Sequence, residues 1–163
     1  RVMSDLSSVS PGLDQLKQEI VQLKRGKQRG HYRPHKLVML LAVIDLAERG
    51  LLKENKIFLS DPLLRTCENI FLLVKRKDDL CQPGPPFFHL RSSGFWFHRV
   101  RSGREEGYSK LTTTGGGLQM IDQYIEYAYL RDDVYTLIQD PASRRELRLL
   151  VSRLLNATED SDG

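Results

Sequence analysis

The stretch Arg33-Pro34-His35-Lys36-Leu37-Val38-Met39-Leu40-Leu41-Ala42-Val43-Ile44 passes from a basic corner into a run of consecutive apolar residues. The run from Leu37 to Ile44 is much shorter than the roughly 18 residues that a membrane span needs, so it predicts a buried helix of a globular protein. Pro34 suits the start of this helix, and Gly50 suits its carboxyl-terminal cap. The side chains expected to face inward are Leu37, Leu40, Leu41, Ile44 and Ala47.

Further helices are predicted on both sides of this one. The pairs Ser10-Pro11, Asp61-Pro62 and Asp140-Pro141 each place a capping residue before a proline, which is typical of a helix start. The ranges Leu118 to Tyr129 and Asp132 to Gln139 also show helical spacing of apolar residues. A short strand is expected at Ile57-Phe58-Leu59, and Arg101 to Gly117, rich in Gly and Thr, is expected to be a mobile loop.

An aromatic strip runs from Pro85 to Arg99. It contains two aromatic runs, Phe87 to Leu90 and Phe95 to Arg99, on either side of Ser92-Ser93-Gly94, and this arrangement predicts a β-hairpin. A chain of 163 residues with 40% hydrophobic residues can bury one sizeable core. We therefore predict an α+β fold: a mostly helical single domain, 1–163, with a small antiparallel sheet that contains the aromatic hairpin, and with flexible ends at 1–10 and 156–163.

Positive charge is segregated along the chain. No acidic residue occurs between Leu80 and Arg104 or between Ile20 and Ile44, and these two windows together carry +10 against +4 for the whole chain. The remainder therefore carries −6. A strongly positive field beside aromatic and histidine side chains indicates a polyanionic partner such as nucleic acid. A membrane surface fits less well, because no basic stretch is also a long amphipathic helix.

Catalytic and metal chemistry find little support in the sequence. His31 and His35 are separated by Pro34, and with only two cysteines no zinc motif is present, so we predict no metal and no cofactor. We name no catalytic residue. A His-Asn-His nuclease site and a phosphate-binding glycine loop are both missing. A restriction-type nuclease site is matched in part by Asp45 with Glu54-Asn55-Lys56, although a turn explains the second element equally well.

Anion binding is better supported. The corner from Arg33 to Lys36 places cationic and imidazole donors at a helix N-terminus, where free N–H groups and the helix dipole favour a phosphate. The alternative is an ordinary solvated basic loop before a helix that starts with proline.

Two motif blocks carry a resemblance to a known family. The block Pro34-His35-Lys36-Leu37, followed about fifty residues later by Pro86-Phe87-x-x-Leu90-Arg91-Ser92-x-Gly94-Phe95-Trp96, resembles the sulfur-binding domain of phosphorothioate-dependent (type IV) HNH restriction endonucleases, over roughly His31 to Leu155. The resemblance implies binding of duplex DNA in which sulfur replaces one non-bridging phosphate oxygen. It also implies a role in bacterial defence and a separate C-terminal HNH nuclease domain, which this chain lacks.

The resemblance also implies a set of site residues. Pro86 matches the pocket proline of the family, and His35 with Lys36 match its basic wall. Pro85 stands where the family commonly has an aromatic residue, and Tyr32 is a candidate for the missing ring. The expected sulfur pocket comprises Tyr32, His35, Lys36, Pro85, Pro86 and His89. The expected DNA-binding residues are Arg25, Lys27, Arg29, His31, Arg33, Arg91, Ser92, Tyr108, Ser109 and Lys110.

Other interpretations stay open at this point. The chain could be a sequence-specific regulator that binds unmodified DNA, or a metal-dependent nuclease that uses Asp45, Glu54 and Lys56. The two cysteines, Cys67 and Cys81, do not form a disulfide framework and fit a reducing cytoplasm.

Overall fold

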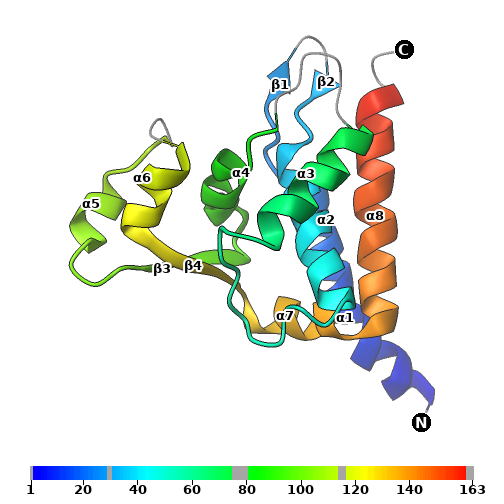
Figure 1. The fold of residues 1–163 in the computed structure, drawn as a ribbon. Coiled ribbons are helices and arrows are strands. Elements are labelled where there is room, and N and C mark those ends of the chain that lie inside the picture. Colours follow the sequence, from blue (N-terminus) through cyan, green and yellow to red (C-terminus); the bar gives the residue numbers. More distant parts are fainter. Residues whose placement is uncertain (1, 29–30, 75–80, 114–116, 161–163) are drawn as a thin grey trace.

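The computed structural model describes residues 2–28, 31–74, 81–113 and 117–160, and it describes side chains for 12–26, 33–74, 81–113 and 117–157. Helices make up most of these residues, with short antiparallel strands beside them (Figure 1). The predicted class, mostly helical α+β with a small antiparallel sheet, is confirmed. The elements in chain order are α1 (Val2–Val21), β1 (Lys27–Gln28), β2 (His31–Tyr32), α2 (His35–Glu48), α3 (Leu63–Val74), α4 (Gly84–His89), the 3-10 helix η1 (Leu90–Ser93), β3 (Trp96–Val100), α5 (Glu105–Ser109), α6 (Gly117–Tyr124), β4 (Ile125–Leu130), α7 (Asp132–Gln139) and α8 (Pro141–Asp160).

Helix α2 forms the centre of the fold. It contacts α3, α4, α7 and α8, and from Leu37 to Ala47 every residue except Asp45 is buried. An apolar helix that is buried around its circumference must be covered on all sides, and the surrounding helices provide this cover (Figure 1). The prediction of a core helix from Leu37 to Ile44 is confirmed.

The helix ends follow the predicted capping chemistry at three places. The Asp140 carboxylate accepts a hydrogen bond from the Ser143 N–H at 2.9 Å at the start of α8. The Asp61 carboxylate accepts one from the Arg65 N–H at 3.2 Å at the start of α3. Gly50 has φ +74° directly after α2, and its N–H donates to the Ala47 carbonyl. A positive φ of this kind favours glycine, so the helix ends there.

The sheet differs from the predicted hairpin. Phe87 to Leu90 was expected to be a strand, but it lies in α4 and the start of η1, so that prediction is wrong. The prolines near the start of α4 explain this result, because proline in the first helical turn loses no hydrogen bond and already has a helical φ. β3 pairs instead with β4, antiparallel, with Trp96 opposite Leu130 and Arg99 opposite Tyr127.

Three other predicted boundaries are corrected. The range Leu118 to Tyr129 was expected to be one helix, but the chain changes from α6 to β4 at Ile125, where alternating Ile125, Tyr127 and Tyr129 pair with β3. The range 101–117 was expected to be a loop, but it contains α5, with residues 114–116 outside the described part. The first helix was expected to start at Ser10-Pro11, but it starts at Val2, since a helix can continue through a proline when it gives up one hydrogen bond.

A buried polar contact joins α4 to the inner face of β3. The Phe87 carbonyl accepts hydrogen bonds from Trp96 Nε1 at 2.9 Å and from His98 Nε2 at 2.9 Å. The Trp96 ring is fully buried and meets the Phe87 ring edge to face at 5.8 Å. A carbonyl that uses both lone pairs fixes the position of α4 against the sheet.

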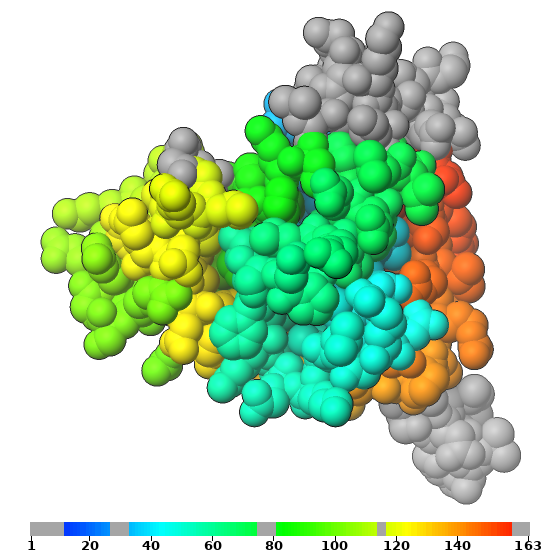
Figure 2. Space-filling view, viewed as in Figure 1, coloured from blue at the N-terminus to red at the C-terminus, as the bar shows by residue number. Residues whose placement is uncertain are grey.

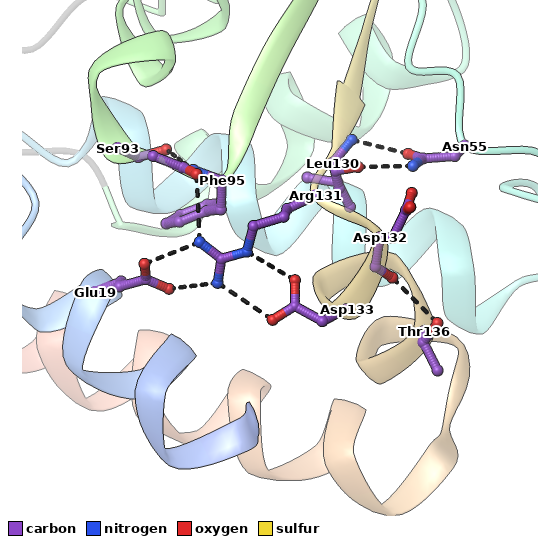
Figure 3. Close-up of polar contacts among 10 residues, drawn as sticks. Glu19, Asn55, Ser93, Phe95, Leu130, Arg131, Asp132, Asp133 and Thr136 are labelled. Atoms are coloured by element: carbon purple, nitrogen blue, oxygen red, sulfur yellow. Dashed lines mark hydrogen bonds and ion pairs between the residues drawn. The ribbon is translucent and has the colours of Figure 1, made fainter. Parts of the chain in front are cut away.

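An arginine connects the other end of the sheet to α1 (Figure 3). The Arg131 guanidinium donates to both carboxylate oxygens of Glu19 at 2.8 and 3.0 Å and to those of Asp133 at 2.7 and 3.3 Å. Nearby, the Asn55 side chain bonds the backbone N–H and C=O of Leu130 at 2.8 and 2.7 Å. These contacts hold α1, β4 and the loop after α2 together.

Candidate anion-binding pocket

A pocket of ≈ 490 Å³ opens between the first turn of α2, helix α4 and the segment that leads into β1. Its walls are mainly cationic and apolar, and no acidic residue is among the described residues that line it. The lining residues are Lys24, Arg25, Gly26, Arg33, His35, Lys36, Gln82, Pro85, Pro86, His89, Arg91 and Ser92.

One wall is set by the chain reversal before α2. The Arg33 N–H donates to the Gly26 carbonyl at 2.9 Å and to the Arg25 carbonyl at 3.3 Å, which closes the base of the β1–β2 ribbon. Gly26 has φ +51°, a conformation that a side chain would strain. The Lys36 ammonium then crosses from α2 and donates to the Lys24 carbonyl at 2.6 Å. The basic corner of the sequence is therefore folded back on itself at the helix N-terminus.

The opposite wall comes from α4 and η1. Pro85 is half-buried and Pro86 is buried. Pro86 also lines a small apolar hollow next to the pocket, which reaches Met39 and Phe71. The His35 ring packs 5.1 Å from the buried Phe71 ring, which limits its freedom. The pocket thus combines proline and imidazole surface with nearby positive charge.

The charges in this pocket repel one another. Burial, and secondly the charge of Lys24, lowers the pKa of Lys36 below its usual value. Burial, followed by the charges of Lys36 and Arg91, lowers the pKa of His89 as well. A bound anion would relieve both effects, because it favours the protonated forms of both groups.

The Arg91 guanidinium is held in a fixed position at the edge of the pocket. It donates to the Leu111 carbonyl at 2.7 Å and lies 4.1 Å from the centre of the Phe88 ring and 5.2 Å from that of Tyr108. Stacked guanidinium groups are poorly hydrated and preorganised for planar or anionic partners.

The Tyr108 ring is held in turn by His98. The two side chains are linked by a 2.7 Å hydrogen bond between the Tyr108 hydroxyl and His98 Nδ1. Because His98 Nε2 must donate to the Phe87 carbonyl, Nδ1 carries the lone pair and Tyr108 is the donor. Burial lowers the pKa of His98 to about 4, so this imidazole is neutral at neutral pH. His98 is therefore a structural residue that positions Tyr108.

The structure brings part of the predicted site together. The predicted residues that line the pocket are Arg25, Arg33, His35, Lys36, Pro85, Pro86, His89, Arg91 and Ser92. Ser92 also donates from its hydroxyl to the His89 carbonyl at 3.0 Å.

Other predicted residues lie elsewhere. Tyr108 does not line the pocket but contacts Arg91, which does. The Ser109 hydroxyl donates a hydrogen bond to the Glu106 carbonyl, and the Lys110 ammonium forms an ion pair with the Glu106 carboxylate at 3.4 Å. The predicted residues whose side chains lie outside the described part are Lys27, Arg29, His31 and Tyr32; the backbones of Lys27, His31 and Tyr32 form β1 and β2.

Sequence reasoning missed three lining residues, Lys24, Gly26 and Gln82. Lys24 could have been found, because it stands beside Arg25 in the acid-free window from Ile20 to Ile44. Gln82 gave no signal, since an isolated glutamine before a proline-rich turn is common in surface loops.

Asp45, the carboxylate considered for nuclease chemistry, is engaged in ion pairs with Arg49 at 2.9 Å and with Arg148 at 3.7 Å. Within the described ranges, no three His, Cys, Asp or Glu side chains are grouped as a metal site would require. Nor does any helix there have the length and apolar character to span a bilayer.

The two cysteines are reduced. Cys67 is buried, with its sulfur 3.9 Å from that of Met39, and Cys81 is exposed. Burial, reinforced by Cys81, raises the pKa of Cys67 to about 12, which makes this thiol unreactive.

Comparison with models of known protein families and with curated proteins found no match to this chain.

Proposed function

We propose that this chain binds double-stranded DNA through the pocket between α2 and α4 and that it recognises a phosphorothioate linkage there. The observation that carries the proposal is the composition of the pocket: cations from Lys24, Arg33, Lys36 and Arg91 surround the Pro85-Pro86 surface, with no carboxylate among the described lining residues. Such a site favours an anion that also has a weakly hydrated, polarisable atom.

Sulfur satisfies this requirement better than oxygen. It is larger and a poorer hydrogen-bond acceptor, so contact with a proline ring costs it little. An ordinary phosphate oxygen at the same place would lose its water without gaining a hydrogen bond, at a cost of about 1–3 kcal/mol. The buried Pro86 is the residue best placed to make this distinction, because it forms a rigid wall without donors.

The surrounding cations would bind the backbone without regard to sulfur. Arg33 and Lys36 stand at the N-terminus of α2, where the helix dipole adds to their charge. Arg91 adds a stacked, fixed guanidinium on the opposite wall. The role of the chain as the recognition part of a restriction endonuclease rests on the resemblance of its two motif blocks alone.

The test compares two duplexes that differ by one sulfur atom. We expect the chain to bind the sulfur-bearing duplex about tenfold or more tightly, as a preference of about 1.4 kcal/mol requires. Pro86→Ala should reduce this preference while leaving the affinity for unmodified duplex nearly unchanged. The matched control is Pro141→Ala at the first residue of α8, which should change neither affinity. Circular dichroism must show that both variants are folded.

Each outcome has a distinct meaning. Equal affinity for the two duplexes would refute sulfur recognition and favour a regulator of unmodified DNA. No binding to either duplex would refute the whole proposal. Metal-dependent cleavage by this chain would support a nuclease, although the Asp45 carboxylate that such a site would use is engaged by Arg49 and Arg148.

The electrostatic part of the proposal predicts a steep salt dependence. The slope of log affinity against log salt should be about −0.9 for each neutralised phosphate. Arg33→Ala should make the slope shallower by about one phosphate without changing the preference for sulfur. A slope near zero for the parent chain would contradict the use of this pocket for a nucleic-acid backbone.

A further inference from the structure

The sheet formed by β3 and β4 has an outer face that lies opposite the face covered by α4. Ile57 forms a bridge with Ala128, so the segment around Ile57 lies on the free edge of β4, whose other edge pairs with β3. Figure 2 shows this teal segment and gold β4 meeting at the molecular surface. Strand alternation places the buried Ile57, Ala128 and Trp96 on the inner face.

The outer face is aromatic. Its described side chains are Lys56, Phe58, Phe97, Arg99, Tyr127 and Tyr129. Phe58 is 47% exposed, Phe97 38% and Tyr129 36%. In a structure that buries Trp96 and Phe87 completely, three large rings left in water on one small sheet are an unusual concentration.

These rings form one continuous ladder. The Phe58 ring lies 5.5 Å from Tyr127, Tyr127 lies 6.3 Å from Tyr129, and Tyr129 lies 5.5 Å from Phe97. The rings therefore hold one another in place across three chain segments, and none of the helices that the structure describes covers this side of the sheet in Figure 1. We call Phe58, Tyr127, Tyr129 and Phe97 the aromatic ladder.

Two cations accompany the aromatic ladder. The Lys56 ammonium lies 5.4 Å from the centre of the Tyr127 ring, and Arg99 stands directly across from Tyr127 in the strand register. Neither makes an ion pair within the part of the chain that the structure describes. Glu105 and Glu126 share a hollow with Arg99 and Tyr129 at one end of the sheet, so the positive charge of Arg99 is opposed there.

We propose that the aromatic ladder binds unpaired bases of single-stranded nucleic acid. Flat rings beside cations suit a base and its phosphate, because stacking is worth about 1–3 kcal/mol per base and does not depend on the base. A duplex would not fit in the same way, since its base faces are already stacked. The two carboxylates near Arg99 oppose phosphate, so stacking must provide most of the affinity.

This site is independent of the proposed DNA pocket. Helix α4 packs on the inner face of the sheet through Phe87, and the pocket lies beyond α4, so the sheet separates the two surfaces. The inference therefore holds or fails without regard to phosphorothioate recognition.

The experiment measures binding of a fluorescent twelve-nucleotide oligothymidine and of an equally long abasic oligomer to the full chain. We expect the oligothymidine to bind about tenfold or more tightly than the abasic oligomer, which has the same charge but no bases. Phe97→Leu with Tyr129→Leu keeps an apolar cross-strand pair but removes two stacking surfaces, and should reduce oligothymidine affinity about tenfold or more. Phe58→Leu, outside β3 and β4, provides a second test if the double variant does not fold.

A control variant on another surface locates the binding. Leu73→Ala on α3 removes a side chain that is 86% exposed and should have no effect on either oligomer. The quantity that reports stacking is the ratio of the two affinities, because phosphate contacts anywhere on the chain serve both oligomers alike. Equal binding of the two oligomers, or an unchanged ratio in folded ladder variants, would overturn the proposal.

Discussion

The hydrogen bonds of the Arg131 guanidinium allow a quantitative prediction about stability. Arg131→Met keeps the aliphatic part of the side chain but removes a guanidinium that makes two hydrogen bonds to Glu19, two to Asp133 and one, at 3.3 Å, to the Gly94 carbonyl. The Arg131 and Glu19 side chains are 28% and 22% exposed, whereas Asp133 is 45% exposed. The Glu19 pair should therefore dominate.

The magnitude follows from these exposures. A hydrogen bond to a charged group contributes about 1.5–3 kcal/mol when it is shielded from water. An exposed pair such as that with Asp133 adds only about 0–1 kcal/mol. We expect Arg131→Met to lower the free energy of unfolding by about 3 kcal/mol, which corresponds to a decrease in Tm of about 10 °C for a domain of this size.

Urea unfolding followed by circular dichroism provides the measurement. Arg145→Met is the matched control, because Arg145 is exposed on α8 and should cost less than about 0.5 kcal/mol. Arg131 lowers the pKa of Asp133. The contribution of this ion pair to the free energy of unfolding is therefore present at neutral pH and is lost as pH falls through that lowered pKa. A loss below about 1 kcal/mol at neutral pH would show that the Arg131 contacts behave as ordinary surface ion pairs.

Further predictions concern His98 and two glycines. The pKa of His98 is about 4 in the folded chain, against about 6.5 when unfolded. The free energy of unfolding should therefore fall by about 3 kcal/mol between pH 6.5 and 4 because of this residue. His98→Gln should flatten this pH dependence in urea titrations at several pH values. An equal slope in the variant would contradict the assignment. Gly12→Ala should raise Tm, since its Cβ would meet Leu137 at an ordinary 3.9 Å and alanine favours a helix by about 1 kcal/mol. Gly107→Ala should lower Tm, since its Cβ would lie 2.7 Å from the Tyr124 ring. A higher Tm for Gly107→Ala than for Gly12→Ala would show that these contacts do not control stability.

The helical part of the fold could be predicted where the signal was local. The run from Leu37 to Ile44 and the cap at Asp140 identify α2 and the start of α8 without knowledge of any distant residue. β4 was different. The spacing of Ile125 fits a helix as well as a strand, and pairing with β3, more than twenty residues away, decides between them.

The aromatic strip shows the same limit. Phe87 and Phe88 have high strand propensity, but Pro85 and Pro86 fix a helical φ before them, and the Phe87 carbonyl is then bonded by Trp96 and His98 from the next strand. For the pocket, charge segregation pointed to the correct windows in the sequence. It could not show that the windows around Lys36 and Arg91 meet, because their meeting depends on how α4 packs against α2.

The positive charge at the amino end of α2, which no acidic side chain of the first turn offsets, has a practical consequence. Its first turn has no acidic residue and no side-chain cap, and Lys36 lies beside it with a lowered pKa. The folded chain should therefore take up small anions from its medium, and each such ion stabilises the native state by mass action. Unfolding free energies measured in phosphate or sulfate will then exceed those measured in chloride by more than general salting-out accounts for. The melting temperature of this protein is consequently a property of the chain together with its buffer anion.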